Sequence, residues 1–253
     1  MILHIPHAST YIPPALRAAI VLSDADLARE LLVMTDHYTD ELFMPAAQPG
    51  DAIIRATVSR LVVDMERFVI DEQEPMASRG MGVIYTRTHD GEVLRRQPTL
   101  FEREQLLAKY YAPHHGLLEA AVQASLQSTG SALVLDCHSF PEKTLPYEMD
   151  QSANRPDICL GADEYHTPDG LLDLAHDVLV SSGYSVAVNT PFSGCLLPMS
   201  SYQKTKRVQG LMIEVNRGLY MDEESGLKLR DMFSHLQAIL AETVESLEAE
   251  VRA

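Results

Sequence analysis

The sequence is short of cysteine, of long apolar runs and of positive charge. Its three cysteines, Cys137, Cys159 and Cys195, show no C-x-x-C spacing, which argues against a disulfide framework and against a structural zinc site built from thiolates. No window approaches the roughly 18 consecutive apolar residues that a transmembrane helix needs. The N-terminus shows no recognisable secretory signal. We therefore expect a cytoplasmic protein.

Basic residues are outnumbered by acidic ones. Lysine and arginine total 20 against 36 aspartates and glutamates, so the formal net charge is −16. A protein with this large negative net charge repels nucleic acid and anionic lipid, and we expect neither as a partner. A small anionic substrate is still compatible, because a local arginine can bind it inside an acidic protein. The oligomeric state is left open.

Several common catalytic motifs are missing as well. The chain has no P-loop, no G-x-G-x-x-G after a strand and no H-E-x-x-H. Ser139 lies beside His138, but no G-x-S-x-G elbow surrounds it, which disfavours a serine hydrolase.

What the chain does have is an alternation of apolar runs with amphipathic segments. This alternation predicts an α/β fold with a mostly parallel sheet covered by helices. No repeat or composition break divides it, so we expect a single domain over residues 1–253. Strands are expected within 2–5, 59–64, 131–136, 157–161, 184–189 and 210–215; helices over 24–43, 100–127 (broken near Pro113), 168–181 and 223–251; and a long functional loop over 66–98, with a hairpin at Asp90-Gly91.

Polar residues gather where four of these strands end. They are His7 and the segments 64–67, 136–139 and 214–217. In open α/β sheets, ligands bind at the carboxyl ends of the strands. We therefore expect these side chains to converge on one site.

Histidine and carboxylate groups in this pattern suit zinc. A catalytic zinc takes three protein ligands and leaves a position for water, and His7 and His138 are the best imidazole candidates. The third ligand is expected to be an acid, either Asp36 or Asp40, which would lie on the same helix face. Asp136 suits a role in orienting His138 or a neighbour.

Other histidines near these segments are given structural places. His4 is expected to be a strand residue outside the site. His114 and His115 lie in a helical stretch, where a structural role is expected, with a position of His115 facing the site left open.

Glu214 stands inside an apolar strand, where a charged carboxylate costs several kcal/mol unless it is paired or lies near a metal. Two roles remain open for it: a general base beside a zinc-bound water, or a salt bridge with Arg217 or another arginine.

Arg60 and Arg67 also have two possible roles. Each can bind a substrate carboxylate through its planar guanidinium fork, or be an ordinary solvated or salt-bridged arginine.

Five short segments stand in order along most of the chain. They are Ile-Pro-His-Ala-Ser at 5–9, Ser-Arg-Leu-Val-Val-Asp-Met-Glu-Arg at 59–67, Tyr-Thr-Arg-Thr-His-Asp-Gly at 85–91, Leu-Asp-Cys-His-Ser at 135–139 and Ile-Glu-Val-Asn-Arg-Gly-Leu-Tyr-Met-Asp-Glu at 213–223.

Together these segments resemble the N-formylglutamate amidohydrolase family, and the likeness runs from about residue 3 to residue 224. The resemblance implies a three-layer αβα fold similar to zinc carboxypeptidases and aspartoacylases (phosphorylase/hydrolase-like), with a central mixed, mostly parallel sheet. It also implies hydrolysis of N-formyl-L-glutamate to formate and L-glutamate, the last step of one histidine degradation route.

The resemblance also implies roles for individual residues. His7 and His138 would bind Zn²⁺, or another divalent metal. Glu214 would be the base that works with the metal-bound water. Arg67 would hold the α-carboxylate of the substrate, with Arg60 and Arg87 as further candidates for that end.

Two positions depart from the family pattern. Glu66 replaces the asparagine of the Asp-Leu-Asn-Arg segment, and Thr10 stands where carboxypeptidase-like relatives place their acidic ligand. An extra acid beside an anionic substrate is unfavourable. Two alternatives therefore stand beside the deformylase: a deacylase or carboxypeptidase-like hydrolase for a different N-acyl amino acid, and a non-catalytic binding protein of the same fold.

Overall fold

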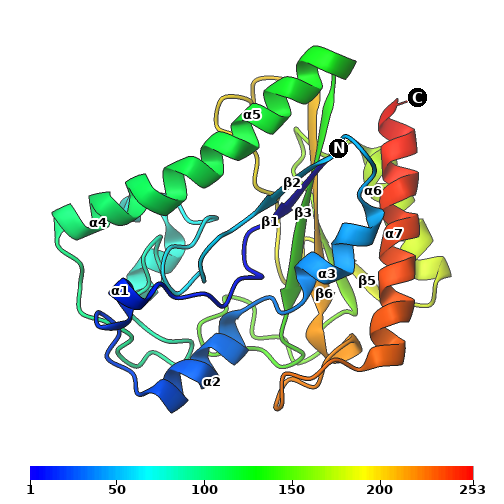
Figure 1. Ribbon diagram of the computed structural model, residues 1–253. Helices are drawn as coiled ribbons and strands as arrows, with labels where there is room; N and C mark the ends of the chain where they lie inside the picture. Colours follow the sequence, from blue (N-terminus) through cyan, green and yellow to red (C-terminus); the bar gives the residue numbers. More distant parts are fainter. Residues whose placement is uncertain (253) are drawn as a thin grey trace.

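The computed structural model describes residues 1–252 and places one six-stranded sheet between helices (Figure 1). The strand order is β2-β1-β3-β6-β4-β5. The pairs β1/β2, β1/β3, β3/β6 and β4/β5 are parallel, and only β4/β6 is antiparallel among these named strands. The expected mixed, mostly parallel sheet is confirmed. The strands are β1 (Ile2–Ile5), β2 (Ala52–Arg55), β3 (Ala132–Phe140), β4 (Ile158–Gly161), β5 (Val186–Val188) and β6 (Val208–Asn216).

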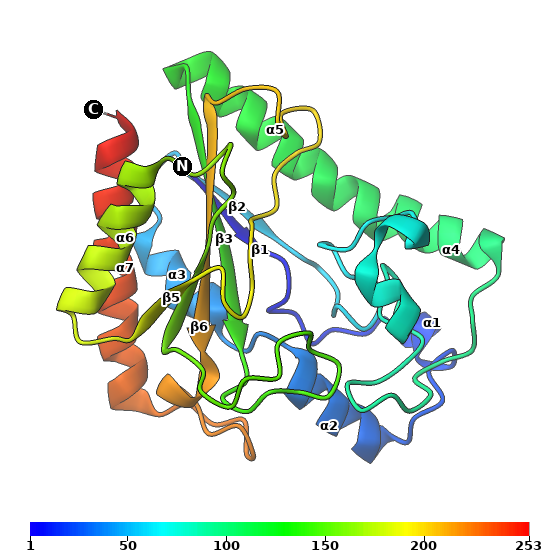
Figure 2. The same ribbon diagram turned by 180° about the vertical axis from the view of Figure 1, so that it is seen from behind.

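Helices cover both faces of the sheet, so the three-layer prediction is confirmed (Figures 1 and 2). On one face Leu118 and Val122 of α5 pack against Ile2 and Val134. On the other face α3, α6 and α7 enclose a larger apolar core. The helices are α1 (Pro14–Arg17), α2 (Asp24–Met34), α3 (Thr39–Phe43), α4 (Leu100–Leu106), α5 (Ala112–Thr129), α6 (Asp169–Ser181) and α7 (Arg230–Arg252), with a π-helical turn (Leu107–Tyr111) and short 3-10 turns at Met44–Ala46, Asp71–Gln73, Pro75–Arg79 and Arg217–Leu219. Over residues 1–252 no helix has the length and apolarity to span a membrane.

The two-residue period of the strands sorts polar from apolar side chains. In β3, Leu133 and Leu135 face the α6/α7 core, whereas Val134 faces α5. Asp136 and His138 follow Val134 at steps of two, so they lie on the α5 face. The register places His4 beside Asp136 and His138 beside Glu214. The sheet itself therefore brings four polar residues from three strands onto one face.

The helix expected over residues 24–43 is wrong. It ends at Met34 and resumes as α3 at Thr39, after an extended Thr35 and a left-handed Tyr38. The backbone N–H of Asp36 donates to the carbonyl of His7 at 3.1 Å. This contact draws the chain across the end of β1, so Asp36 lies in a connector rather than on a helix.

The strand expected over Ser59–Asp64 is also wrong. The segment forms turns, closed by a hydrogen bond from the Val62 N–H to the Ser59 carbonyl at 2.8 Å, and the parallel strand of this region is β2. Its apolar residues are buried in side-chain clusters instead of being paired in the sheet. The hairpin at Asp90-Gly91 is confirmed by an antiparallel bridge between Arg87 and Val93. Figure 2 shows the cyan to teal segment over residues 66–98 together with α1 and α4 at one side of the sheet.

The last helix starts later than expected, at Arg230 rather than at Glu223. An antiparallel bridge between Met221 and Lys228 holds the preceding residues in a turn.

Candidate metal centre and active site

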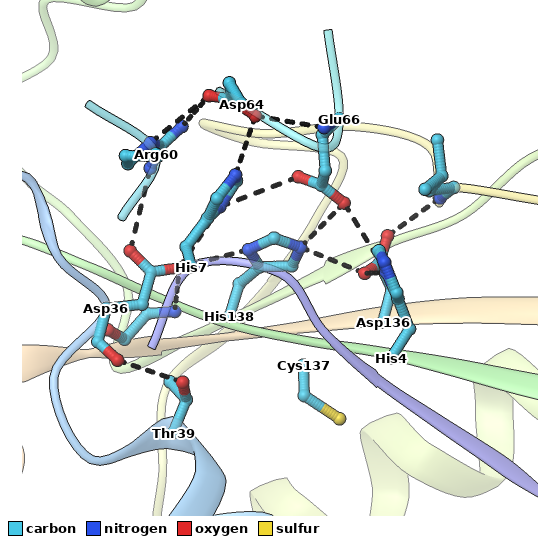
Figure 3. A network of polar contacts seen from close by, with 12 residues as sticks. His4, His7, Asp36, Thr39, Arg60, Asp64, Glu66, Asp136, Cys137 and His138 are labelled. Carbon is cyan, nitrogen blue, oxygen red and sulfur yellow. Dashed lines mark hydrogen bonds and ion pairs between the residues drawn. The ribbon is translucent and has the colours of Figure 1, made fainter. Parts of the chain in front are cut away.

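The three predicted metal ligands meet at the carboxyl edge of the sheet (Figure 3). Oδ2 of Asp36 lies 3.1 Å from Nδ1 of His138 and 3.7 Å from Nδ1 of His7. All three side chains are buried, and their ligand atoms lie within 4.8 Å of one another. Donor atoms around a tetrahedral zinc with bonds of about 2.0–2.1 Å are roughly 3.3 Å apart. The separations fit a metal ion with little movement.

Both imidazoles are oriented by a carboxylate on their other nitrogen. Nε2 of His7 lies 2.8 Å from Asp64 Oδ1, and Nε2 of His138 lies 3.0 Å from Asp136 Oδ1. The contact expected between Asp136 and His138 is present. Nδ1 of His7 is buried and has no hydrogen-bond partner. An imidazole held by a carboxylate, with its remaining nitrogen free, is the usual arrangement of a metal-binding histidine.

Asp36 is held in its ionised form. Burial alone would raise its pKa, but the hydrogen bond from His138 and the nearby charges of His7 and Arg217 bring the pKa well below the ordinary value. Nη2 of Arg217 lies 3.0 Å from Asp36 Oδ1. A permanently ionised carboxylate is what a cation site requires of its acidic ligand.

Glu214 is a buried acid of this site whose carboxylate is not fully hydrogen-bonded. Its Oε2 is buried without a hydrogen-bond partner, and burial, reinforced by the charges of Asp36 and Glu66, raises its pKa to about 8. Within residues 1–252 Glu214 forms no salt bridge with Arg217 or another arginine, the alternative role expected from the sequence, and Arg217 pairs with Asp36 instead. Beside a metal-ligating group, such an acid is placed to accept and return a proton.

Two of the three predicted substrate-binding arginines lie next to this centre. Nη2 of Arg60 lies 3.0 Å from Asp64 Oδ2, and Nε of Arg67 lies 3.6 Å from the same oxygen. Arg87 lies exposed on the hairpin, where its Nη1 donates to the Gly91 carbonyl at 3.4 Å. The structure therefore gathers Arg60 and Arg67 but shows no contact of Arg87 with the centre.

The alternative acidic ligand does not join the histidines. Asp40 lies on α3, where its Oδ2 accepts from Nη1 of Arg55 at 3.3 Å, and its side chain is 32% exposed. The break between α2 and α3 removes the shared helix face on which this alternative depended.

Two histidines that the sequence placed outside the site belong to its network. Nδ1 of His4 lies 2.7 Å from Asp136 Oδ1, and Nε2 of His4 lies 2.8 Å from Nε2 of His114. His115 instead contacts the Met65 carbonyl at 2.8 Å. The strand period offered a signal for His4, since it shares the face of Ile2. Nothing in the sequence pairs it with a helix residue 110 positions away.

Buried imidazoles and carboxylates at the carboxyl edge of an α/β sheet define a candidate hydrolase centre able to hold a metal. The chain belongs to the N-formylglutamate amidohydrolase family, whose profile matches residues 1–221. The resemblance drawn from the five segments is confirmed.

Individual relatives agree with this assignment. An N-formylglutamate deformylase from Pseudomonas putida is 26% identical over 98% of this chain and 92% of its own length. The crystal structure of an N-formylglutamate amidohydrolase from Ralstonia eutropha, also 26% identical, superposes with a TM-score of 0.85 over 99% of this chain and 93% of that one. A gene product from Agrobacterium tumefaciens, 18% identical, shares the fold with a TM-score of 0.67 over 98% of this chain and 91% of its own.

Proposed function

We propose that this chain is a metal-dependent amidohydrolase that converts N-formyl-L-glutamate to formate and L-glutamate, the last step of one histidine degradation route. The Pseudomonas putida relative, named for this activity, aligns over nearly the whole chain. The observation that carries the proposal is the unpartnered, buried Glu214 beside the His7–Asp36–His138 group.

His7, Asp36 and His138 would hold the metal, with zinc as the expected ion. A bound zinc ion supplies Lewis acidity, which polarises a carbonyl and lowers the pKa of water toward about 7. The side chains fit such an ion because Asp36 is ionised and His7 keeps a free nitrogen. Asp64 and Asp136 hold the two rings in place.

Glu214 would be the general base and then the general acid. It takes a proton from the attacking water as the new C–O bond forms at the formyl carbon. It returns that proton to the amide nitrogen as the C–N bond breaks, so formic acid and a neutral amine leave, and the acid then releases its own proton to become formate. Its pKa of about 8 leaves it protonated at neutral pH, and nearby positive charge favours the ionised form that can act as a base.

Arg60 and Arg67 would hold the carboxylate end of the substrate. Nε of Arg67 is buried without a hydrogen-bond partner, so it has a donor available for a substrate oxygen. The guanidinium fork matches a carboxylate through two parallel hydrogen bonds. Arg87 stays a prediction for this end.

One observation favours a second candidate, a hydrolase for a different N-acyl amino acid. The Glu66 carboxylate lies 3.0 Å from Nε2 of His138, inside the region that an anionic substrate must approach. Like charges at short range repel, which would favour a neutral or cationic substrate.

A matched substrate panel separates these candidates. N-formyl-L-glutamate and N-formyl-L-glutamine differ in one charge and hardly in shape, and N-acetyl-L-glutamate differs only in the acyl group. We expect the zinc-loaded protein to release amine fastest from N-formyl-L-glutamate. Preference for the glutamine compound would replace the deformylase by the second candidate. No hydrolysis of any N-acyl amino acid would identify a binding protein.

A further inference from the structure

A second group of ligand-type side chains lies directly beside the first. His4, Asp136 and Glu66 each offer one ligand atom, and these atoms lie within 4.8 Å of one another. Nδ1 of His4 is 2.7 Å from Asp136 Oδ1 and 3.9 Å from Glu66 Oε1. These two separations bracket the roughly 3.3 Å between neighbouring donors of a tetrahedral zinc. The group therefore has the composition and the spacing of a cation site.

The ring of His4 is fixed from both of its nitrogens. Its Nε2 lies 2.8 Å from Nε2 of His114, and its Nδ1 lies 2.7 Å from Asp136 Oδ1. Without a metal, Nδ1–H donates a hydrogen bond to the Asp136 carboxylate. In the other tautomer Nε2–H donates to His114, and the Nδ1 lone pair and the carboxylate are then both available to a cation that takes the place of that hydrogen.

Glu66 reaches both groups with different oxygens (Figure 3). Its Oε2 lies 3.8 Å from Nδ1 of His7, in the first group. Its Oε1 lies 3.9 Å from Nδ1 of His4 and 3.0 Å from Nε2 of His138. A carboxylate placed in this way can share itself between two neighbouring metal ions, as in two-metal hydrolases.

We propose that His4, Asp136 and Glu66 form a second divalent-cation site for a zinc-type ion, with Glu66 shared between the two sites. The inference rests on the proposed function for the first ion, whereas the second group stands on its own contacts. It also accounts for the acid at Glu66, where the family pattern has an asparagine. An acid that would repel the substrate becomes a metal ligand whose charge the ion cancels.

The test is the metal content of the full-length protein. The protein is loaded with Zn²⁺, freed of excess ion by gel filtration and measured by mass spectrometry of the metal. We expect two zinc ions per chain in the wild type and one in each of His4→Asn, Glu66→Gln and His7→Asn. His115→Asn is the matched control on α5, because His115 contacts a backbone carbonyl, and it should keep two. Anomalous diffraction of the wild type at the zinc edge should show two peaks, one bonded to Nδ1 of His4.

The outcomes separate the two proposals. One zinc in the wild type, retained by His4→Asn and lost by His7→Asn, would overturn the second site and leave the proposed function intact. No zinc in the wild type would overturn both. A His4→Asn protein that loses every ion or fails to fold leaves the decision to the anomalous map, where a single peak away from His4 refutes the second site.

Discussion

Strand β3 passes through two regions that are equally hidden from water but chemically opposite. All nine of its residues are buried. On one face Leu133, Leu135 and Cys137 join the apolar core beneath α6 and α7, whereas on the other Asp136 and His138 enter the polar network. Apolar side chains gain free energy from burial itself, but buried acids and imidazoles cost free energy unless they are paired. The comparison separates a face that stabilises the fold from a face arranged for chemistry.

The largest expected effect is the loss of turnover in Glu214→Gln, a change on the polar face of the sheet. The change keeps the shape of the side chain and removes its ability to accept a proton, so turnover should fall by about 10²- to 10⁴-fold, the usual contribution of a general acid–base group. Zinc content and the circular dichroism spectrum should match those of the wild type. Undiminished kcat in this variant would remove Glu214 from the proposed role.

Leu240→Ala should instead lower the stability that the apolar face provides. Leu240 is fully buried in the core beneath α7, and truncating such a leucine costs about 2–5 kcal/mol of unfolding free energy. Urea denaturation measures this loss. Zinc content and kcat should be unchanged at temperatures where the variant is folded. A large drop in kcat there would show that the two faces are not separate.

Arg67→Met tests whether the polar face also binds the substrate. Loss of a hydrogen bond to a charged group costs about 1.5–3 kcal/mol, so kcat/KM for N-formyl-L-glutamate should fall roughly 10- to 100-fold, mostly through KM. Arg87→Met is the matched control, because Arg87 contacts its own hairpin, and should change kcat/KM less than twofold. Equal losses in both variants would count against the assignment of the carboxylate end to Arg67.

His89 offers the smallest effect, outside both regions. A hydrogen bond from His89 to Glu30 at 2.6 Å raises the pKa of His89 above its ordinary 6.5. The stabilisation is therefore complete below pH 6.5 and is lost as pH rises through the raised value. His89→Asn should lower the unfolding free energy by under about 1 kcal/mol at pH 6 and by less at pH 9. Urea denaturation at both values checks the sign, and a larger loss at pH 9 would refute it.

Local sequence pattern was sufficient for five of the six strands and for part of the site. The apolar runs of β1, β3, β4 and β6 predicted buried strands, and their carboxyl ends predicted where His7 and His138 meet. The pattern failed where distant contacts decide. The hydrogen bond from Asp36 to the His7 carbonyl ends α2 early, and no local propensity shows it.

The segment 59–64 failed for a related reason. Its β-branched residues favour a strand, but burial in side-chain clusters satisfies them without sheet pairing. His4 and His114 were missed because their contact joins a strand to a helix across the molecule.

The most direct measurement follows turnover as metal is returned to the metal-free protein. Chelated protein is titrated with Zn²⁺ while formate release from N-formyl-L-glutamate and bound zinc are recorded together. We expect no turnover without metal and recovery that rises with bound zinc, with no recovery in His7→Asn. Full turnover in the metal-free protein, or zinc binding that restores no hydrolysis, would contradict a metal-dependent amidohydrolase centred on His7, Asp36 and His138.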